Sequence, residues 1–161
     1  MIHLPSEVAP GVTYYEVMHS ETAERHAIDN SLPIELIDNV TYAAQRMVIV
    51  RAILAKRVYV SSWYRCLALN TFLGSKPTSD HVKGLAIDFA CPGYGSPIEI
   101  CKELIKHADE LNYKQLILEH TWVHISFNAI PTALAKKEVL SLLASGGYAS
   151  GLTDKFGKLL T

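Results

Sequence analysis

The sequence predicts an α+β domain in which a small antiparallel sheet packs against helices, and three patterns support this prediction. Apolar residues step by three and four between residues 34 and 56, which is the spacing of one buried stripe on a long helix. Residues 96–99, SPIE, form a capping box that opens a second helix with proline at its first position. Residues 115–127, QLILEHTWVHISF, have the length and β-branched content of a β-hairpin.

Shorter patterns predict the remaining elements. Residues 13–16, TYYE, match a capping box and predict a short helix that runs towards His26. Residues 58–65 predict a strand, and residues 78–93 predict a loop, a strand and a turn. We expect Asn128 to cap a last helix that continues through residue 143 and ends before a pair of glycines.

We therefore expect a single domain over residues 1–161. Its parts would be a helical N-terminal part to about residue 56, a core at residues 58–128 that carries the candidate site, and a C-terminal helix and tail at residues 129–161. Nothing in residues 148–161 indicates a role.

Composition excludes several classes of protein. Hydrophobic residues make up 49% of the chain and charged residues 19%, which excludes long disorder. The net charge is -1 and no basic stripe is present, so a nucleic-acid partner has no electrostatic support. No apolar run has the roughly 18 residues of a membrane span. We expect a monomer. We also expect synthesis in the cytoplasm without a signal peptide, because the first residues, MIHLPSEVAPG, lack its basic and apolar regions. The three cysteines lack metal-type spacing and are expected to be buried thiols.

An aspartate inside an apolar strand is the first indication of a site, because burying a carboxylate costs several kcal/mol unless a cation compensates it. Strand alternation places Asp88 on a face with only two small neighbours, Gly84 and Ala86, and sends the large apolar side chains to the other face. The same alternation places His124 on a face with Trp122. Two strands thus each offer one potential metal ligand.

These positions predict a zinc site formed by His81, Asp88 and His124, with one coordination position left for water. Two imidazoles, a carboxylate and an open position are typical of catalytic zinc, whereas structural zinc sites are closed and usually rich in thiolates. Zinc lowers the pKa of its water towards about 7, and a nearby carboxylate can then take the proton. Glu119 is our choice for that base.

The predicted hairpin explains the choice of Glu119. A turn at residues 120–121 would place Glu119 opposite Trp122 and Ile117 opposite His124. Glu119 would then be a diagonal neighbour of His124 at about 7–8 Å between backbones. The pair at the turn lacks the Asn-Gly type of sequence that tight hairpins prefer.

Other interpretations stay open at this point. Asp88 can instead form a buried structural ion pair with Arg65, which needs no metal. His120 has the i, i+4 spacing to His124 of a helical zinc pair, but its surroundings favour a strand. The remaining histidines are expected to be surface or hydrogen-bonded residues: His3, His19, His26 and His107.

The pattern S-x-H-x-x-G-x-A-x-D at residues 79–88, with SWYR before it and WVH after it, resembles the zinc D-alanyl-D-alanine carboxypeptidase/dipeptidase superfamily. That superfamily includes phage L-alanyl-D-glutamate endopeptidases and shares its fold with the Hedgehog signalling domain. The resemblance runs from about Tyr15 to Phe127 and is greatest to a branch often met in tailed phages.

The resemblance implies a Hedgehog/DD-peptidase-like fold, a zinc cofactor and roles for seven residues. It assigns zinc to His81, Asp88 and His124, the base to Glu119, a grip on a substrate carboxylate or oxyanion to Arg65, and contributions near the substrate to Ser79 and Tyr64. Three features depart from the family pattern. The base lies five residues before the last histidine rather than three, Trp63 replaces a usual glycine, and Gly74-Ser75 replaces a common glycine pair.

The resemblance also implies a function. We expect a zinc metallopeptidase that hydrolyses peptide bonds in the stem peptides of bacterial peptidoglycan, as a phage endolysin or related lytic enzyme. The bond cut, of D,D-carboxypeptidase/dipeptidase or L,D-endopeptidase type, stays open. Such an enzyme would reach the cell wall after release from the cell. The alternative is a non-catalytic, metal-stabilised structural or binding module of the same fold, such as a component of a phage particle.

Overall fold

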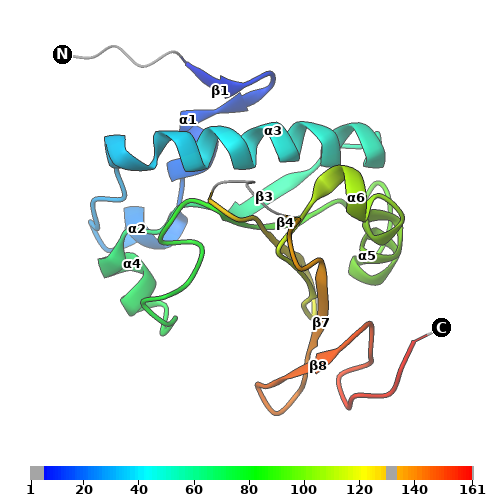
Figure 1. Ribbon diagram of the computed structural model, residues 1–161. Helices are drawn as coiled ribbons and strands as arrows, with labels where there is room; N and C mark the ends of the chain where they lie inside the picture. Colours follow the sequence, from blue (N-terminus) through cyan, green and yellow to red (C-terminus); the bar gives the residue numbers. More distant parts are fainter. Residues whose placement is uncertain (1–5, 130–133, 161) are drawn as a thin grey trace.

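The computed structural model describes residues 6–129 and 134–160, and its architecture is α+β, as predicted (Figure 1). A six-stranded sheet has the strand order β3-β4-β6-β5-β7-β8, and a separate two-stranded sheet pairs β1 with β2. The strands are β1 (Glu7–Ala9), β2 (Val12–Thr13), β3 (Tyr59–Ser62), β4 (Ala86–Ala90), β5 (Gln115–Leu118), β6 (Val123–Ser126), β7 (Glu138–Leu142) and β8 (Tyr148–Ser150).

The helices are α1 (Tyr14–Met18), α2 (Glu21–Arg25), the 3-10 turn η1 (Ile34–Leu36), α3 (Ile37–Leu54), α4 (Leu67–Phe72), α5 (Pro97–Lys106) and α6 (Ala108–Leu111). In Figure 1, α3 runs across the top of the molecule, α5 and α6 lie on the right, and α2 and α4 lie on the left. Side chains of α3 and α5 share one core with the apolar face of the central strands, which includes Leu85, Ile87, Phe89, Val123 and Ile125. The other face of those strands is therefore free to carry polar groups.

Of the two predicted capping boxes, the one at residues 96–99 forms in full, whereas the one at residues 13–16 forms only its hydroxyl half, because the Glu16 carboxylate pairs with Arg51. The Ser96 hydroxyl and the Glu99 carboxylate cap the start of α5 reciprocally, and Pro97 is its first residue. The Thr13 hydroxyl accepts a hydrogen bond from the Glu16 backbone N–H at 3.1 Å. The chain towards His26 forms two short helices, α1 and α2, rather than one.

The predicted hairpin of β5 and β6 forms with the predicted register. Ile117 lies opposite His124. The Glu119 N–H donates to the Trp122 carbonyl at 3.1 Å, which closes the turn. On the other side of β6, Asp88 of β4 lies opposite His124. The polar face of the sheet thus carries residues from β4, β6 and β5 in neighbouring positions.

The predicted C-terminal helix is wrong for the residues that the structure describes. Residues 138–142 form β7, which pairs in parallel with β5, and the glycine pair 146–147 lies in the turn between β7 and β8. Residues 130–133, which the helix prediction also covers, lie outside the described residues. The edge of β5 explains the difference. If residues 138–142 were helical, the backbone N–H and C=O groups along this edge would have no strand partner, whereas pairing with β7 satisfies them.

Two further expectations can be compared with the structure. Cys91 and Cys101 are buried free thiols, whereas Cys66 is partly exposed at the start of α4. Among the described residues, no helix is both long and apolar enough to cross a membrane. The division of the chain into one domain stays a prediction.

Candidate metal centre

The site begins with a cross-strand pair on the polar face of the sheet. Asp88 of β4 lies opposite His124 of β6, and Asp88 Oδ1 lies 2.8 Å from His124 Nδ1. Both side chains face away from the core because their neighbours along the strands, such as Ile87 and Ile125, fill the other face. Two-residue alternation alone therefore brings these two groups together.

His81 joins the pair from the loop before β4. The loop folds back on itself through two turns, in which the Gly84 N–H donates to the His81 carbonyl and the Val82 N–H donates to the Ser79 carbonyl, both at 3.1 Å. His81 is buried, and its Nε2 lies 3.2 Å from Asp88 Oδ2. Donor atoms of His81, Asp88 and His124 all lie within 4.8 Å of one another.

The chemistry of His81 indicates that this group suits a cation. Its Nδ1 lies 2.7 Å from the Trp63 carbonyl, which only accepts hydrogen bonds, so Nδ1 carries a proton. Burial lowers the pKa of His81, although the neighbouring Asp88 carboxylate acts in the opposite direction. The lowered pKa favours the neutral ring. When the neutral ring is protonated on Nδ1, the lone pair of Nε2 points at a carboxylate oxygen of Asp88, and the two electron-rich atoms repel each other. A cation bound between Nε2 and this oxygen removes the repulsion.

The electrostatics of Asp88 fit the same interpretation. Burial alone would raise the pKa of Asp88, but its contacts, led by the hydrogen bond with His124, outweigh burial and hold the pKa below its usual range. The carboxylate is therefore ionised in a buried place. Two imidazoles and one ionised carboxylate form the donor set that zinc prefers in catalytic sites.

Trp63 supports the site from behind. Its side chain is 1% exposed, and its indole N–H donates to the Gly84 carbonyl at 2.9 Å. The tryptophan thus holds His81 through its carbonyl and the start of β4 through its indole. A tryptophan where the family has glycine therefore contributes to the core.

Arg65 contacts the same carboxylate. Its Nη2 lies 2.8 Å from Asp88 Oδ2, and its Nε donates to Ser62 Oγ at 2.7 Å. Burial lowers the pKa of Arg65, while Asp88 acts in the opposite direction. The ion pair considered as an alternative to a metal site is thus present, but Asp88 faces both histidines as well. The two arrangements share one carboxylate and do not exclude each other.

Glu119 lies on the same face, beyond Ile117 on the strand that pairs with His124. It is 8% exposed, and within the described part of the chain its carboxylate has no hydrogen-bond or ion-pair partner. Burial raises the pKa of Glu119, which His124 opposes and Asp88 reinforces. A raised pKa and a free carboxylate suit a group that accepts and returns a proton.

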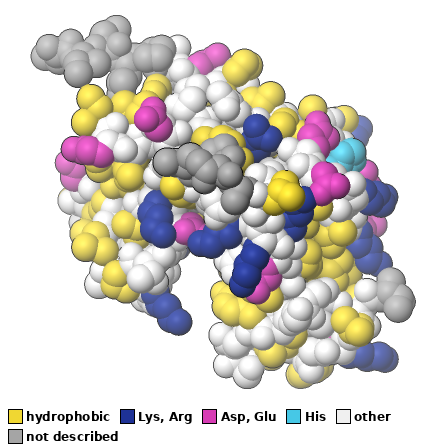
Figure 2. All heavy atoms as spheres, viewed as in Figure 1, with side chains coloured by type: hydrophobic (Ala, Val, Ile, Leu, Met, Phe, Trp, Pro, Cys, Tyr) yellow, Lys and Arg dark blue, Asp and Glu magenta, His cyan; other side chains and the backbone are white. Residues whose placement is uncertain are grey.

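A cleft of about 480 Å³ opens beside this site, with Arg65, Asp88 and Trp122 in its lining. Its other wall comes from α2, including Arg25 at its end, and from the residues just before it, including His19. The space-filling view shows a notch on this side of the molecule, between the part that contains α2 and α4 and the part that contains β8 (Figure 2). No sequence pattern indicated that His19 or Arg25 would line this cleft.

The two remaining predicted site residues support the backbone around the site. The Ser79 hydroxyl accepts a hydrogen bond from the His81 N–H at 3.3 Å. Tyr64 is buried, and its N–H donates to the Val17 carbonyl at 3.1 Å. Direct contact of either side chain with a substrate stays a prediction. His120 lies at the hairpin turn, outside the group of His81, Asp88 and His124 that could hold a metal ion.

Sequence reasoning missed Asn30. Its amide donates to the Met18 and Tyr64 carbonyls at 2.8 and 3.1 Å, and its side-chain oxygen accepts from the Cys66 N–H at 2.7 Å. The asparagine thus holds the backbone on both sides of Arg65. A lone asparagine in a polar stretch has no pattern that distinguishes it from a turn residue.

A family model described as Peptidase M15 matches residues 10–126. The match includes all seven predicted site residues: Tyr64, Arg65, Ser79, His81, Asp88, Glu119 and His124. A search of curated proteins finds no match to this chain.

Proposed function

The chain belongs to the peptidase M15 family of zinc-dependent metallopeptidases, and on this basis we propose that it hydrolyses peptide bonds in the stem peptides of bacterial peptidoglycan. One observation carries the proposal. His81, Asp88 and His124 converge beside a cleft, and a buried carboxylate, Glu119, lies on the same face without a hydrogen-bond or ion-pair partner among the described residues. A metal site that also has a free base and a neighbouring arginine is suited to hydrolysis.

The residues divide the chemistry between them. His81, Asp88 and His124 would hold zinc, which when bound polarises a carbonyl and activates a water molecule. Glu119 takes a proton from the attacking water and returns it to the nitrogen of the leaving amine, so that one peptide bond and one O–H bond break as a carboxylate and an amine form. Its position on the strand beside His124 supports this role.

Arg65 serves the substrate. A planar guanidinium grips a carboxylate or an oxyanion through two parallel hydrogen bonds and keeps its charge when buried. The Arg65 Nε is fixed by Ser62, and one edge of the group faces Asp88. This anchoring positions the arginine at the cleft without requiring it to order on binding.

We further propose that the enzyme acts in a phage context, as an endolysin or related lytic enzyme that reaches the cell wall after release from the cytoplasm. The motif at residues 79–88, most similar to a branch found in tailed phages, supports this placement. The bond that is cut is left to experiment, because the two specificities differ in the loops that line the cleft.

The test is cleavage of a defined muropeptide that contains both an L-alanyl-D-glutamate and a D-alanyl-D-alanine bond. We expect the zinc-loaded protein to release one new amino and one new carboxyl end, identified by mass spectrometry. Glu119→Gln should retain zinc and lose turnover by about 10²–10⁴-fold, the usual contribution of a general base. A protein that binds zinc at full occupancy and leaves both bonds intact would refute the proposed function.

A further inference from the structure

The C-terminal hairpin of β7 and β8 extends the polar face of the sheet beyond the region matched by the family model, which ends at residue 126. Cross-strand partners form a continuous row across this face. From Asp88 the row passes through His124 and Ile117 to Leu140 and Ser150. The hairpin therefore adds two strands to the same surface that carries the metal-binding group.

Tyr148 lies in the neighbouring row, in line with Glu119. Leu118 pairs with Ser141, so the next residue, Glu119, lies beside Leu142, and Leu142 pairs with Tyr148. Alternation places Leu142 and Tyr148 on the polar face together with Glu119. Two strand spacings of about 4.8 Å separate the backbones of Glu119 and Tyr148, and a tyrosine side chain leaning across Leu142 covers much of that separation.

The surroundings of Tyr148 suit a ligand contact. The residue is 54% exposed, and within the described part of the chain its hydroxyl has no hydrogen-bond partner. Partial burial, together with the charges of Glu119 and Asp88, raises the pKa of Tyr148, so its hydroxyl keeps its proton and can donate it in a hydrogen bond.

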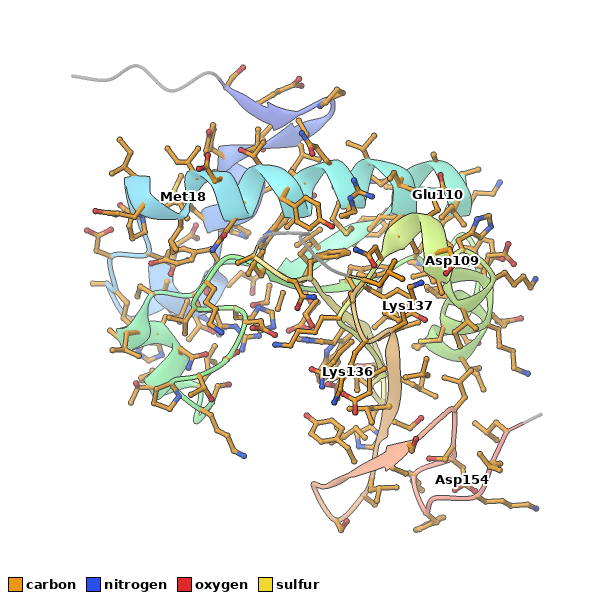
Figure 3. All side chains as sticks on the ribbon, in the orientation of Figure 1. Met18, Asp109, Glu110, Lys136, Lys137 and Asp154 are labelled. Carbon is orange, nitrogen blue, oxygen red and sulfur yellow. The ribbon has the colours of Figure 1, made fainter. Side chains whose placement is uncertain are left out.

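The hairpin is attached firmly enough to position this side chain. The Lys137 N–H donates to the Tyr113 carbonyl at 3.1 Å, and its ammonium forms an ion pair with Asp109 of α6 (Figure 3). The Ser141 hydroxyl donates to the Gly151 carbonyl at 2.8 Å and accepts from the Thr153 N–H at 2.9 Å. Tyr148 thus stands on a braced strand rather than on a free tail.

We propose that Tyr148 contacts the substrate, donating a hydrogen bond from its hydroxyl to an oxygen of the peptide on the Glu119 side of the site. Arg65, next to β3 and β4, lies on the opposite side of the metal-binding group. A peptide held by both residues crosses the site between them. This inference rests on the proposed function, and it adds a specificity residue from outside the matched region.

The test separates binding from turnover. Glu119→Gln provides a zinc-loaded protein that holds an uncleaved stem peptide, and calorimetry measures its affinity with and without Tyr148→Phe. We expect Tyr148→Phe to weaken peptide binding roughly threefold to tenfold, the loss of one neutral hydrogen bond. In the otherwise native enzyme, KM should rise by a similar factor while kcat changes by less than about twofold.

Tyr59→Phe is the matched control. Tyr59 is a half-exposed tyrosine on the other edge strand, β3, where its ring lies 4.8 Å from the Arg57 guanidinium. We expect this variant to bind and cleave like the native protein. The inference is overturned if Tyr148→Phe leaves the affinity unchanged, if only kcat falls, or if the Glu119→Gln protein binds no stem peptide. Binding without cleavage by the native enzyme refutes the proposed hydrolysis alone.

Discussion

Replacing Gly84 by alanine should destabilise the protein more than the same replacement at Gly11. Gly84 has φ +70°, and an added Cβ would lie 2.5 Å from Val40 Cγ2. Val40 is fully buried in α3, so it has no free space into which it can move. Gly84 is also the glycine of the S-x-H-x-x-G-x-A-x-D motif.

Two effects add in Gly84→Ala. A non-glycine residue in the left-handed region costs about 1–2 kcal/mol. Forcing a methyl group into a packed core costs about 1–3 kcal/mol more. The sum of about 2–5 kcal/mol is a large part of the 5–15 kcal/mol that stabilises a typical domain. Urea unfolding of the zinc-free protein measures it directly.

Gly11→Ala isolates the backbone contribution. Gly11 has φ +71°, almost the same angle, but nothing lies within 4 Å of an added Cβ. We expect it to cost about 1–2 kcal/mol at most. Adding Val40→Ala to Gly84→Ala should recover part of the excess, which a double-mutant cycle quantifies. If Gly84→Ala costs no more than Gly11→Ala, the proposed contact with Val40 does not exist.

Three further predictions concern the site. His81→Ala should abolish stoichiometric zinc binding, measured by elemental analysis. It should also abolish the stabilisation by zinc, which is about 2.7 kcal/mol when zinc is present at a hundred times its Kd. His107→Ala, at the end of α5, should keep the zinc and the stabilisation. Arg65→Lys should lower kcat/KM roughly tenfold to a hundredfold, since one charge-assisted hydrogen bond is worth about 1.5–3 kcal/mol, and an unchanged value would exclude a bidentate grip. Because the pKa of Glu119 is raised in the folded state, the zinc-free protein loses stability as pH rises through that pKa. The Tm of Glu119→Gln should therefore exceed that of the native protein at pH values above the folded pKa and equal it below pH 4. Equal Tm values at all pH values would contradict the raised pKa.

The central strands could be predicted because their pattern has only one solution. Alternation over residues 84–89 and 122–127 gives each strand one apolar face. A shift of the register by one residue would bury Asp88 and His124 in the core. The positions of these two side chains therefore followed from the sequence alone. The position of His81 was supported less directly, because a loop of turns carries no periodicity; it was predicted from its place in a polar loop seven residues before Asp88, and the resemblance added to that prediction.

The C-terminal strand could not be predicted, and the reason is again physical. Residues 134–143, LAKKEVLSLL, have the composition of a helix, and local propensity is a weak guide where a neighbouring edge offers backbone partners. Pairing of β7 with β5 is a contact between distant parts of the chain. The α1–α2 wall of the cleft was missed for the same reason, since its residues reach the site only through tertiary packing.

The arrangement of charges argues for catalysis over a purely structural metal. A structural ion is stabilised by its ligands alone, and its surroundings gain nothing from further buried charges. Here burial raises the pKa of Glu119 and lowers the pKa of Arg65, so each group is less stable as an ion than it would be in water. Keeping these two groups beside Asp88 lowers the stability of the fold but supplies the base and the cation that hydrolysis needs. Such a loss of stability in favour of function is expected of an active site.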